Sequence, residues 1–332
     1  MLAAERIKLL AARTGFDLCG VASCRRFAES EARFRAWLGK GCHASLGYLE
    51  RNVDKRFDPR LLVDGARTAV VCAVGYKNRA GGGYPEGHRA KVASYACATD
   101  YHTTLRAMLH RLFALLAAEY PGLAGRAFVD TAPLSEKRLA VEAGLGWIGR
   151  QSLLVTPCFG TYVLLGELLL TDEADRYDAP FEGSRCGSCR RCLDSCPSGA
   201  LAEPYEVDAR RCISRHTVER ETDGRIDLGG WIFGCDACQS CCPYNRQAPM
   251  HALPAFDPLS DPVAMGPAEW LAMDEATFDA RLGATPLARS GLRRLQRNLR
   301  PEAEPDAGGA AAAANRCPEK KTADGGAAPR GE

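Results

Sequence analysis

The sequence predicts a mixed fold of helices and strands in three consecutive parts, followed by a tail. In residues 1–175, short apolar runs alternate with helical periodicity, which is the pattern of helices layered on a sheet. Residues 176–250 carry most of the cysteines, and residues 251–300 return to a helical pattern. We therefore expect an α/β sandwich, a cysteine-rich domain and basic C-terminal helices. Over 301–332 we expect a disordered tail rich in Ala, Gly and Pro.

The elements of the first part can be followed along the chain. The run at 68–75 is apolar throughout, which is typical of a strand buried on both faces. The polar stretch 49–62 is predicted to be a link that turns at Asp58-Pro59, and 80–88 is predicted to be a loop. Helical spacing predicts helices over 3–14, 28–39, 101–118 and 134–143. Further apolar runs predict strands over 16–22 and 127–130, and two strands within 152–170 around a turn at 157–160.

Composition indicates a globular protein of the cytoplasm. The 332 residues are 46% apolar and 25% charged, with a net charge of only +2. No stretch approaches the roughly 20 apolar residues of a membrane span, and the charged, amphipathic start does not resemble a secretory signal. We therefore expect no membrane association. In that compartment thiols stay reduced, so the sixteen cysteines are not expected to form disulfides.

Two cysteine-dense runs, CGSCRRCLDSCP at 186–197 and CDACQSCCP at 235–243, indicate iron–sulfur clusters. In the first run, three thiolates at two-residue gaps can hold one cubane, and the fourth, before a proline, points to a second cluster. The second run lacks one cysteine, which Cys212 can supply. Eight ligands give two 4Fe–4S clusters in a ferredoxin-like domain. By this crossover the first set is Cys186, Cys189, Cys192 and Cys242, and the second set is Cys196, Cys212, Cys235 and Cys238.

Two alternatives to this assignment were weighed. Cys241 competes with its neighbour Cys242, but the proline of the pattern follows Cys242. Zinc sites would use separate CxxC pairs, and a run of three cysteines ending in Cys-Pro does not have that spacing. The other cysteines are most simply explained as small buried apolar residues, and Cys317 as an incidental thiol of the tail.

The first part of the chain should contain what the clusters reduce. It has no GxGxxG between a strand and a helix, so a dinucleotide site is not supported. The chemical candidates are Asp130, at the end of a strand, and the polar group Tyr95, Asp100, Tyr101 and His102. The simpler roles are a helix cap or turn for Asp130 and a buried structural histidine for His102.

Several stretches together resemble the epoxyqueuosine reductases, which are iron–sulfur and cobalamin enzymes of tRNA queuosine synthesis. They cover most of residues 48–245 and include ERNVDKRFDPRLLVDGART, SYACATDYHTTL, VDTAPLSEKRLAVEAGLGWIGRQSLLVTPCFGTYVLLGELLLT, DARRCISRHTVE and WIFGCDACQSCCPYN. The resemblance implies that the N-terminal domain binds cobalamin and is related to the corrinoid domain of reductive dehalogenases. It also implies that the clusters supply low-potential electrons, from an unidentified donor, to reduce the epoxide of epoxyqueuosine.

The resemblance also implies roles for individual residues. Asp130 corresponds to the family's proton donor, for which we expect a pKa raised by burial. The residues that match segments lining the cobalamin are Arg56, Tyr95, Asp130, Gly149, Ser214 and Asp236. Apart from Asp130, their simpler roles are ion pairing, core packing, a tight turn, a cap and a local turn, respectively. Because the chain lacks DxHxxG, we expect no histidine as lower ligand of the cobalt.

Arginine-rich segments point to the tRNA. Residues 281–300 hold six arginines and no acid, and 208–220 add four arginines with two acids. Such segments neutralise phosphates without reading sequence, and the modified base would be swung out of its stack to react. The simpler interpretation is a solvated basic helix face.

Three functions therefore compete. The first is the reduction of epoxyqueuosine in tRNA by a cytoplasmic monomer. The second is an electron-transfer protein that reduces the corrinoid of a partner, and the third is a corrinoid reductase of a small molecule. Asp130 and the arginine-rich C-terminal segment favour the first, because a simple electron carrier needs neither.

Overall fold

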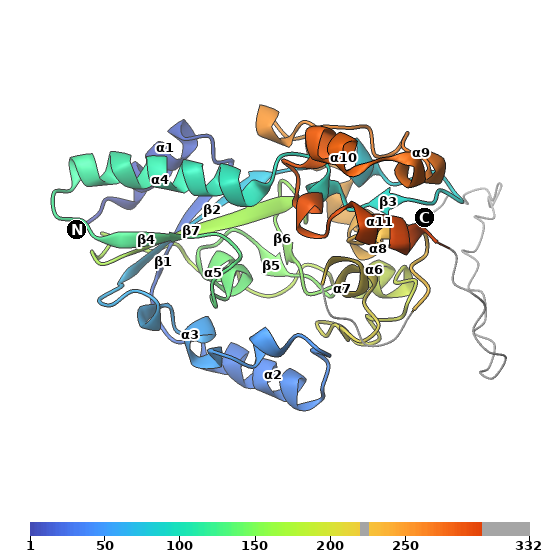
Figure 1. The fold of residues 1–332 in the computed structure, drawn as a ribbon. Coiled ribbons are helices and arrows are strands. Elements are labelled where there is room, and N and C mark those ends of the chain that lie inside the picture. Colours follow the sequence, from blue (N-terminus) through green and yellow to red (C-terminus); the bar gives the residue numbers. More distant parts are fainter. Residues whose placement is uncertain (220–225, 301–332) are drawn as a thin grey trace, which may run out of the picture. The chain divides into compact units, whose positions relative to one another are not determined.

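A four-stranded antiparallel sheet lies at the centre of the first part of the chain (Figure 1). The structure is a computed structural model that describes residues 1–219 and 226–300. The strands lie in the order β1 (Leu18–Ser23), β2 (Thr68–Gly75), β7 (Val163–Leu170) and β4 (Gly125–Phe128). Each neighbouring pair is antiparallel. All residues of β2 are buried, which confirms the prediction made from its unbroken apolar run.

Helices cover both faces of this sheet. Val70, Cys72 and Val74 of β2 face one cluster of buried residues, while Ala69, Val71 and Ala73 face another, because side chains alternate along a strand. The first face is covered by α1 (Ala4–Arg13) and α4 (Tyr101–Glu119), and the second by α2 (Ala28–Gly39), α3 (Val53–Phe57) and α5 (Glu136–Glu142). The α4 residues Leu105, Leu109, Leu112 and Leu116 are fully buried, and each contributes about 1.5–3 kcal/mol.

Two small sheets connect this sandwich to the rest of the chain. The hairpin of β5 (Trp147–Ile148) and β6 (Leu154–Val155) leads into β7. β3 (Lys91–Val92) pairs in parallel with β8 (Trp231–Phe233), so the first part and the cysteine-rich part share a sheet. The C-terminal helices α9 (Pro267–Ala272), α10 (Glu275–Leu282) and α11 (Leu292–Leu299) pack their apolar side chains on β3 and β8.

Short helices order the cysteine-rich part and the connections. They are α6 (Arg191–Asp194), α7 (Ile213–Val218) and α8 (Ala237–Ser240). The 3-10 helices are Gly47–Leu49, Pro59–Leu61, Arg79–Gly82, Ser94–Ala96, Pro243–Asn245, Pro254–Phe256 and Pro286–Arg289.

The observed elements confirm the predicted mixed fold and correct it in one place. The stretch 49–62, predicted to be a link, contains α3, whose Val53 and Phe57 are buried. The predicted turn at Asp58-Pro59 is present, because the Asp58 side chain accepts from Arg60 N–H at the start of a 3-10 helix. Met1–Leu299 form one compact unit, and the limits at 175 and 250 stay a prediction.

Two further predictions concern the tail and the membrane. The disorder predicted for 301–332, and Cys317 within it, lie outside the described residues. In the ranges that the structure does describe, no helix combines the length and the apolar character needed to cross a bilayer.

Candidate active site and cluster-binding segment

Asp130 lies two residues beyond the end of β4 and is held in an unusual backbone conformation. Its φ is +55°, a left-handed value that only a few per cent of non-glycine residues adopt and that aspartate tolerates better than most. The conformation is held from the start of α5, because Asp130 N–H donates to Glu136 Oε1 over 2.5 Å. Residues with such values persist where surrounding contacts impose them.

The first residues of α4 hold the Asp130 carboxylate. Tyr101 Oη donates to Asp130 Oδ2 over 3.0 Å, and His102 Nε2 lies 3.2 Å from the same oxygen. Asp100 caps α4 by accepting from the backbone N–H of His102, and its Oδ1 also lies 2.8 Å from His102 Nδ1. Both ring nitrogens of His102 therefore have carboxylate partners.

These contacts overturn the pKa expected for Asp130. The hydrogen bond with His102 lowers the pKa of Asp130 below its usual range, and burial, which acts in the opposite direction, does not prevail. The same hydrogen bond raises the pKa of His102. The prediction of an acid whose pKa burial raises was wrong, because the side chain is 51% exposed and a histidine lies beside it. The pair therefore carries its proton on His102.

Tyr95 lies within reach of the charge of Asp130, and Arg56 within reach of that of Glu136, which accepts the Asp130 N–H. Burial raises the pKa of Tyr95, and the charges of Asp236 and Asp130 add to that rise. The Tyr95 ring meets Tyr101 edge to face at 6.1 Å. Arg56 places its guanidinium over the Phe34 ring at 5.6 Å. Its Nε atom is buried, with no hydrogen-bond partner among the described residues.

The sequence analysis missed two residues of this region. The charge of Arg289, in the C-terminal 3-10 helix, lowers the pKa of Asp130. Burial raises the pKa of Tyr48, and the charges of Glu219 and Asp130 act in the same direction. Arg289 belongs to the arginine-rich segment, which was a usable signal. Tyr48 precedes a polar stretch and gave none.

Two predicted residues, Asp236 and Gly149, have identifiable structural partners. Asp236 is buried, and its Oδ2 accepts the N–H of Ser94 over 2.7 Å, which fixes the 3-10 helix that carries Tyr95. Gly149 donates to Leu153 O in the β5–β6 hairpin, and a Cβ there would lie 2.4 Å from Gln151 Oε1. Their assignment as cofactor contacts stays a prediction.

Ser214 and its neighbour Arg215 lie at the start of α7, beside Cys212. Burial raises the pKa of the Cys212 thiol, and the backbone N–H groups of Arg215 and Ser214 act against that rise. Ser214 is therefore placed with the second set of cysteines. Gly149 lies beside Gln151, which lines the cavity of the first set of cysteines.

The first set of cysteines lines one cavity of about 220 Å³. The thiols of Cys186, Cys189 and Cys192 come from one side of it, and Cys242 comes from the other run. Among the described residues, Cys241 does not line this cavity, and its Sγ donates to Cys238 O over 3.5 Å. The remaining lining residues are Arg150, Gln151, Arg185, Arg191, Pro243 and Tyr244.

The second set shares another region. Burial raises the pKa of Cys238 well above its usual value, and the charges of Cys235, Cys212 and also Cys196 raise it further. Burial also raises the pKa of Cys235, and the charges of Cys212 and Cys196 add to that rise. The four thiols of the second set are therefore close to one another, and their assignment as cluster ligands stays a prediction. Within 1–219 and 226–300, no group of three or more His, Cys, Asp or Glu side chains is arranged for a single metal ion.

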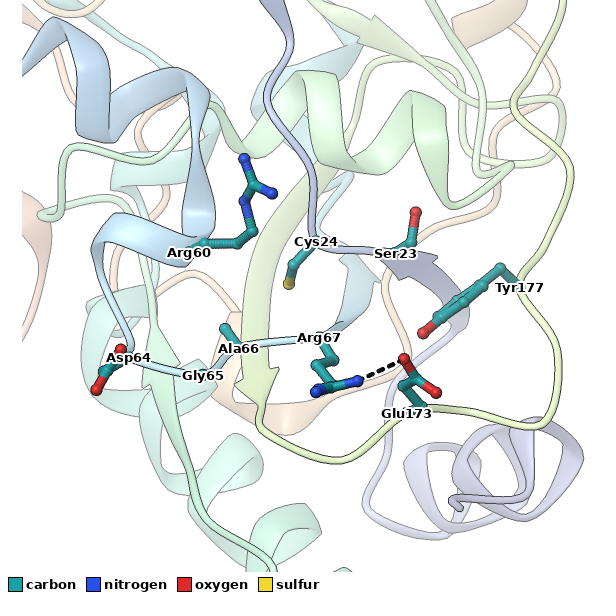
Figure 2. A pocket seen from close by; sticks show the side chains of 9 residues that line it. All are labelled: Ser23, Cys24, Arg60, Asp64, Gly65, Ala66, Arg67, Glu173 and Tyr177. Atoms are coloured by element: carbon teal, nitrogen blue, oxygen red, sulfur yellow. Dashed lines mark hydrogen bonds and ion pairs between the residues drawn. The ribbon is translucent and has the colours of Figure 1, made fainter.

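A larger hollow, of about 460 Å³, lies at the other end of the central sheet (Figure 2). It borders Ser23 and Arg67, at the end where β1 finishes and β2 begins, whereas Asp130 follows the opposite end of β4. Its arginines already have acidic partners. Arg67 pairs with Glu173 at 2.8 Å, as Figure 2 shows, and Arg60 pairs with Asp58. This hollow contains none of the predicted site residues.

Comparisons with known proteins agree with the two-part arrangement. Residues 56–131 match the family model described as Epoxyqueuosine reductase QueG, DUF1730, and residues 185–245 match the 4Fe-4S double cluster binding domain. The epoxyqueuosine reductase of Cellulophaga algicola is 35% identical over 305 residues, which cover 89% of this chain and 96% of that protein. That of Cyclobacterium marinum is 36% identical over 303 residues, covering 88% and 94%.

Solved structures show the same likeness. Epoxyqueuosine reductase from Streptococcus thermophilus superposes with a TM-score of 0.76 at 29% identity, covering 89% of this chain and 79% of that one. An epoxyqueuosine reductase with a tRNA-Tyr epoxyqueuosine-modified stem loop gives the same values. A structure from Bacillus subtilis, with a TM-score of 0.75, has its catalytic aspartate loop swung out of the active site.

Proposed function

Because the chain belongs to the epoxyqueuosine reductase family, we propose that it reduces epoxyqueuosine to queuosine at the anticodon wobble position of tRNA. The observation that carries this proposal is that one compact unit holds both an acid–histidine pair and two four-cysteine sets. The reaction breaks both C–O bonds of the epoxide, forms a C=C bond and releases the oxygen as water. It consumes two electrons and two protons.

The two cysteine sets hold the two 4Fe–4S clusters that supply the electrons. The match of 185–245 to a double cluster domain supports this assignment. The cavity of the first set supports it as well, because it is flanked by Arg150, Arg185 and Arg191, and cationic side chains stabilise a reduced, anionic cluster. Gln151 Nε2 is buried at this cavity without a hydrogen-bond partner in the part of the chain described, so it is available to a cluster sulfur.

The residues around Asp130 fit a bound cobalamin. Arg56, Tyr95 and Asp130 would hold it, with Gly149, Ser214 and Asp236 on the side of the clusters. When bound, cobalamin supplies a cobalt centre that carries out the two-electron chemistry. The buried Arg56 Nε, which lacks a partner within 1–219 and 226–300, is a polar atom that a ligand could satisfy. His102 uses both ring nitrogens on carboxylates, which supports a cobalt without a histidine lower ligand.

Asp130 passes a proton to the departing epoxide oxygen, and His102 holds that proton before it is passed on. The exposed half of the carboxylate can reach a substrate, whereas Oδ2 faces Tyr101 and His102. Because this contact raises the pKa of His102, the histidine keeps its proton to a higher pH than a free imidazole does. A proton held in this way lies next to the carboxylate through which it reaches the substrate.

The C-terminal arginines contact the tRNA backbone. Several have acidic partners, which makes this face less basic than the sequence suggested: Arg281 pairs with Glu269, Arg289 with Glu219 and Arg293 with Glu275. Arg297 on α11 is exposed and remains for a phosphate. The enzyme acts as a cytoplasmic monomer and takes electrons from a low-potential donor.

Conversion of an epoxyqueuosine-containing tRNA by the reconstituted protein tests this function. The protein is loaded anaerobically with iron, sulfide and cobalamin and reduced chemically, and nucleoside mass analysis detects the loss of one oxygen. We expect conversion by the wild type and a loss of at least 10²-fold in Asp130→Asn. Asp64→Asn, in the hollow of Figure 2, is the matched control and should keep full activity.

The other outcomes identify the competing functions. Equal activity of Asp130→Asn and wild type would remove the acid from the mechanism. Absence of conversion, with two clusters and reducible cobalamin in place, would refute the tRNA assignment. Reduction of a partner's corrinoid, or of a small molecule, would then be the activity to assay.

A further inference from the structure

Removal of an epoxide oxygen as water needs two protons. The source of the second proton can be inferred from the structure, and this inference rests on the proposed function. Asp130 and His102 together can deliver only one proton before they must be recharged. The residues next to it include two glutamates that the reaction as described does not use, Glu136 and Glu167. Glu136 contacts the backbone of Asp130, and Glu167 is buried beside Glu136. This arrangement indicates a role in proton supply.

Glu136 is in direct contact with the backbone of Asp130. It is the first residue of α5, and its Oε1 accepts the backbone N–H of Asp130 over 2.5 Å. Its other neighbour is the carboxyl group of Glu167, which lies on β7 directly opposite Phe128 of β4, two residues before Asp130. Glu136 is only partly buried, so it connects the interior with the open side of the site.

Glu167 lies in the interior of the sheet. It is 0% exposed, on a strand that otherwise reads VLLG and LLL, and its polar neighbour is the carboxyl group of Glu136. An ionised carboxylate in such a place would cost several kcal/mol. The neutral, protonated form is therefore the stable one. Burial raises the pKa of Glu167 well above its usual value, and the charge of Glu136 raises it further.

We propose that Glu136 and Glu167 form a carboxyl pair that stores a proton and passes it to the Asp130 site, supplying the second proton of each turnover. One proton, held by His102, passes through Asp130 to the epoxide oxygen. The second leaves the pair through Glu136, and the two together convert that oxygen to water. The two electrons come from the external reductant through the clusters. Solvent then reprotonates the pair through the partly exposed Glu136.

The groups that face the pair set the pH at which it works. Asp130, in the loop after β4, disfavours the charge of Glu136, whereas the hydrogen bond with Glu167, on β7, and the charge of Lys137 favour it. Arg56 on α3 and Tyr101 on α4 feel the charge of Glu136, and Cys72 on β2 feels that of Glu167. Burial, with the charge of Asp130, raises the pKa of Glu136 to about 7. The stored proton is therefore present at neutral pH and is lost above it.

Glu136→Gln separates proton storage from positioning. The glutamine carbonyl can still accept the N–H of Asp130, so the loop keeps its support, but the amide cannot deliver a proton. We expect kcat to fall by about 10²-fold or more, with the Kd for tRNA within about twofold of wild type. The wild-type rate should fall as the pH rises through about 7, and the variant should lose this dependence. Wild-type kcat and pH profile in Glu136→Gln would overturn the proposal.

Infrared spectroscopy reads the stored proton without any reaction. The cluster-loaded protein, with no tRNA and no cobalamin, should show the C=O band of a buried protonated carboxyl group. Glu167→Gln should remove this band, and it should fold, because the amide replaces a neutral group of the same size. Glu142→Gln is the matched control, since Glu142 is a buried glutamate of α5 that is ion-paired with Arg25 and Arg138. It should leave the band in place.

The two readouts keep the proposals apart. A band that is absent, or unchanged in Glu167→Gln, would overturn the carboxyl pair whatever the activity. If the wild type does not convert the tRNA, the proposed function fails by itself, and the infrared result alone then decides whether the pair holds a proton.

Discussion

Replacement of Cys242 by alanine should remove one of the two clusters and spare the other. Cys242 lines the same cavity as Cys186, Cys189 and Cys192, and we propose it as the fourth thiolate of the first set. Its neighbour Cys241 carries the same thiol one residue away but points to Cys238 O. The two positions are therefore a matched pair for testing the crossover between the runs.

The size of the effect follows from the stoichiometry. A double 4Fe–4S domain holds two clusters of four irons, eight in all. A set with three thiolates holds its cube poorly, so anaerobically reconstituted Cys242→Ala should retain about four irons per chain. Cys241→Ala should retain all eight. Iron and sulfide analysis gives the count, and electron paramagnetic resonance of the reduced protein shows whether one cluster signal or two coupled signals remain.

The opposite pattern would refute the assignment. If Cys241→Ala halves the iron and Cys242→Ala does not, then Cys241 is the ligand, and the proline rule fails for this chain. If neither variant loses iron, the two thiols substitute for each other, and the cavity does not define the ligand set. Loss of iron in both variants would mean that the crossover depends on more than one thiol of the second run.

Two further predictions concern the tRNA and the interior of the sheet. Arg297→Ala should weaken tRNA binding by a similar factor for every tRNA, because a phosphate contact does not depend on sequence. The slope of log K against log[salt] should become shallower by about one, because one phosphate contact is lost. Filter binding between about 50 and 200 mM salt measures both effects. Glu167 has a raised pKa in the folded protein, so its stabilising effect is complete below the usual value of 4.5 and declines as the pH rises above it. Thermal melts from pH 5 to 8 should therefore show that the free energy of unfolding of Glu167→Gln increases relative to that of wild type by up to about 1.4 kcal/mol per pH unit. Parallel curves of stability against pH for the two proteins would contradict a neutral Glu167.

The parts of the fold that the sequence predicted are those with a local physical signal. The strand β2 is an unbroken apolar run and α4 has helical periodicity over five turns, and both were found almost to the residue. The helix α3 was missed because only Val53 and Phe57 of its five residues are buried, and the remainder read as a polar link. Buried positions that recur at a regular interval can be predicted, whereas two isolated anchors in a charged stretch cannot.

The site divides along the same line. The cysteine ligands follow spacing rules within short runs, so the sets could be predicted without the fold. The state of Asp130 could not, because it depends on His102, which lies 28 residues away in sequence. The state of Glu167 could have been predicted from the sequence, because a single acid in the middle of an apolar strand must be either neutral or paired.

The structure also decides how the remaining cofactor predictions can be tested. Asp236 follows Cys235, a proposed cluster ligand, and its side chain accepts the N–H of Ser94. The adjacent Tyr95 packs on Tyr101, which donates to Asp130. This series of contacts joins the second set of cysteines to Asp130. A substitution at Asp236 that weakens cobalamin binding would therefore change the Tyr95 segment as well. Arg56 is free of this ambiguity, because its guanidinium packs on Phe34 and its buried Nε has no partner among the described residues. Of the predicted contacts, Arg56 is thus the position where loss of cobalamin affinity can be attributed to the side chain itself.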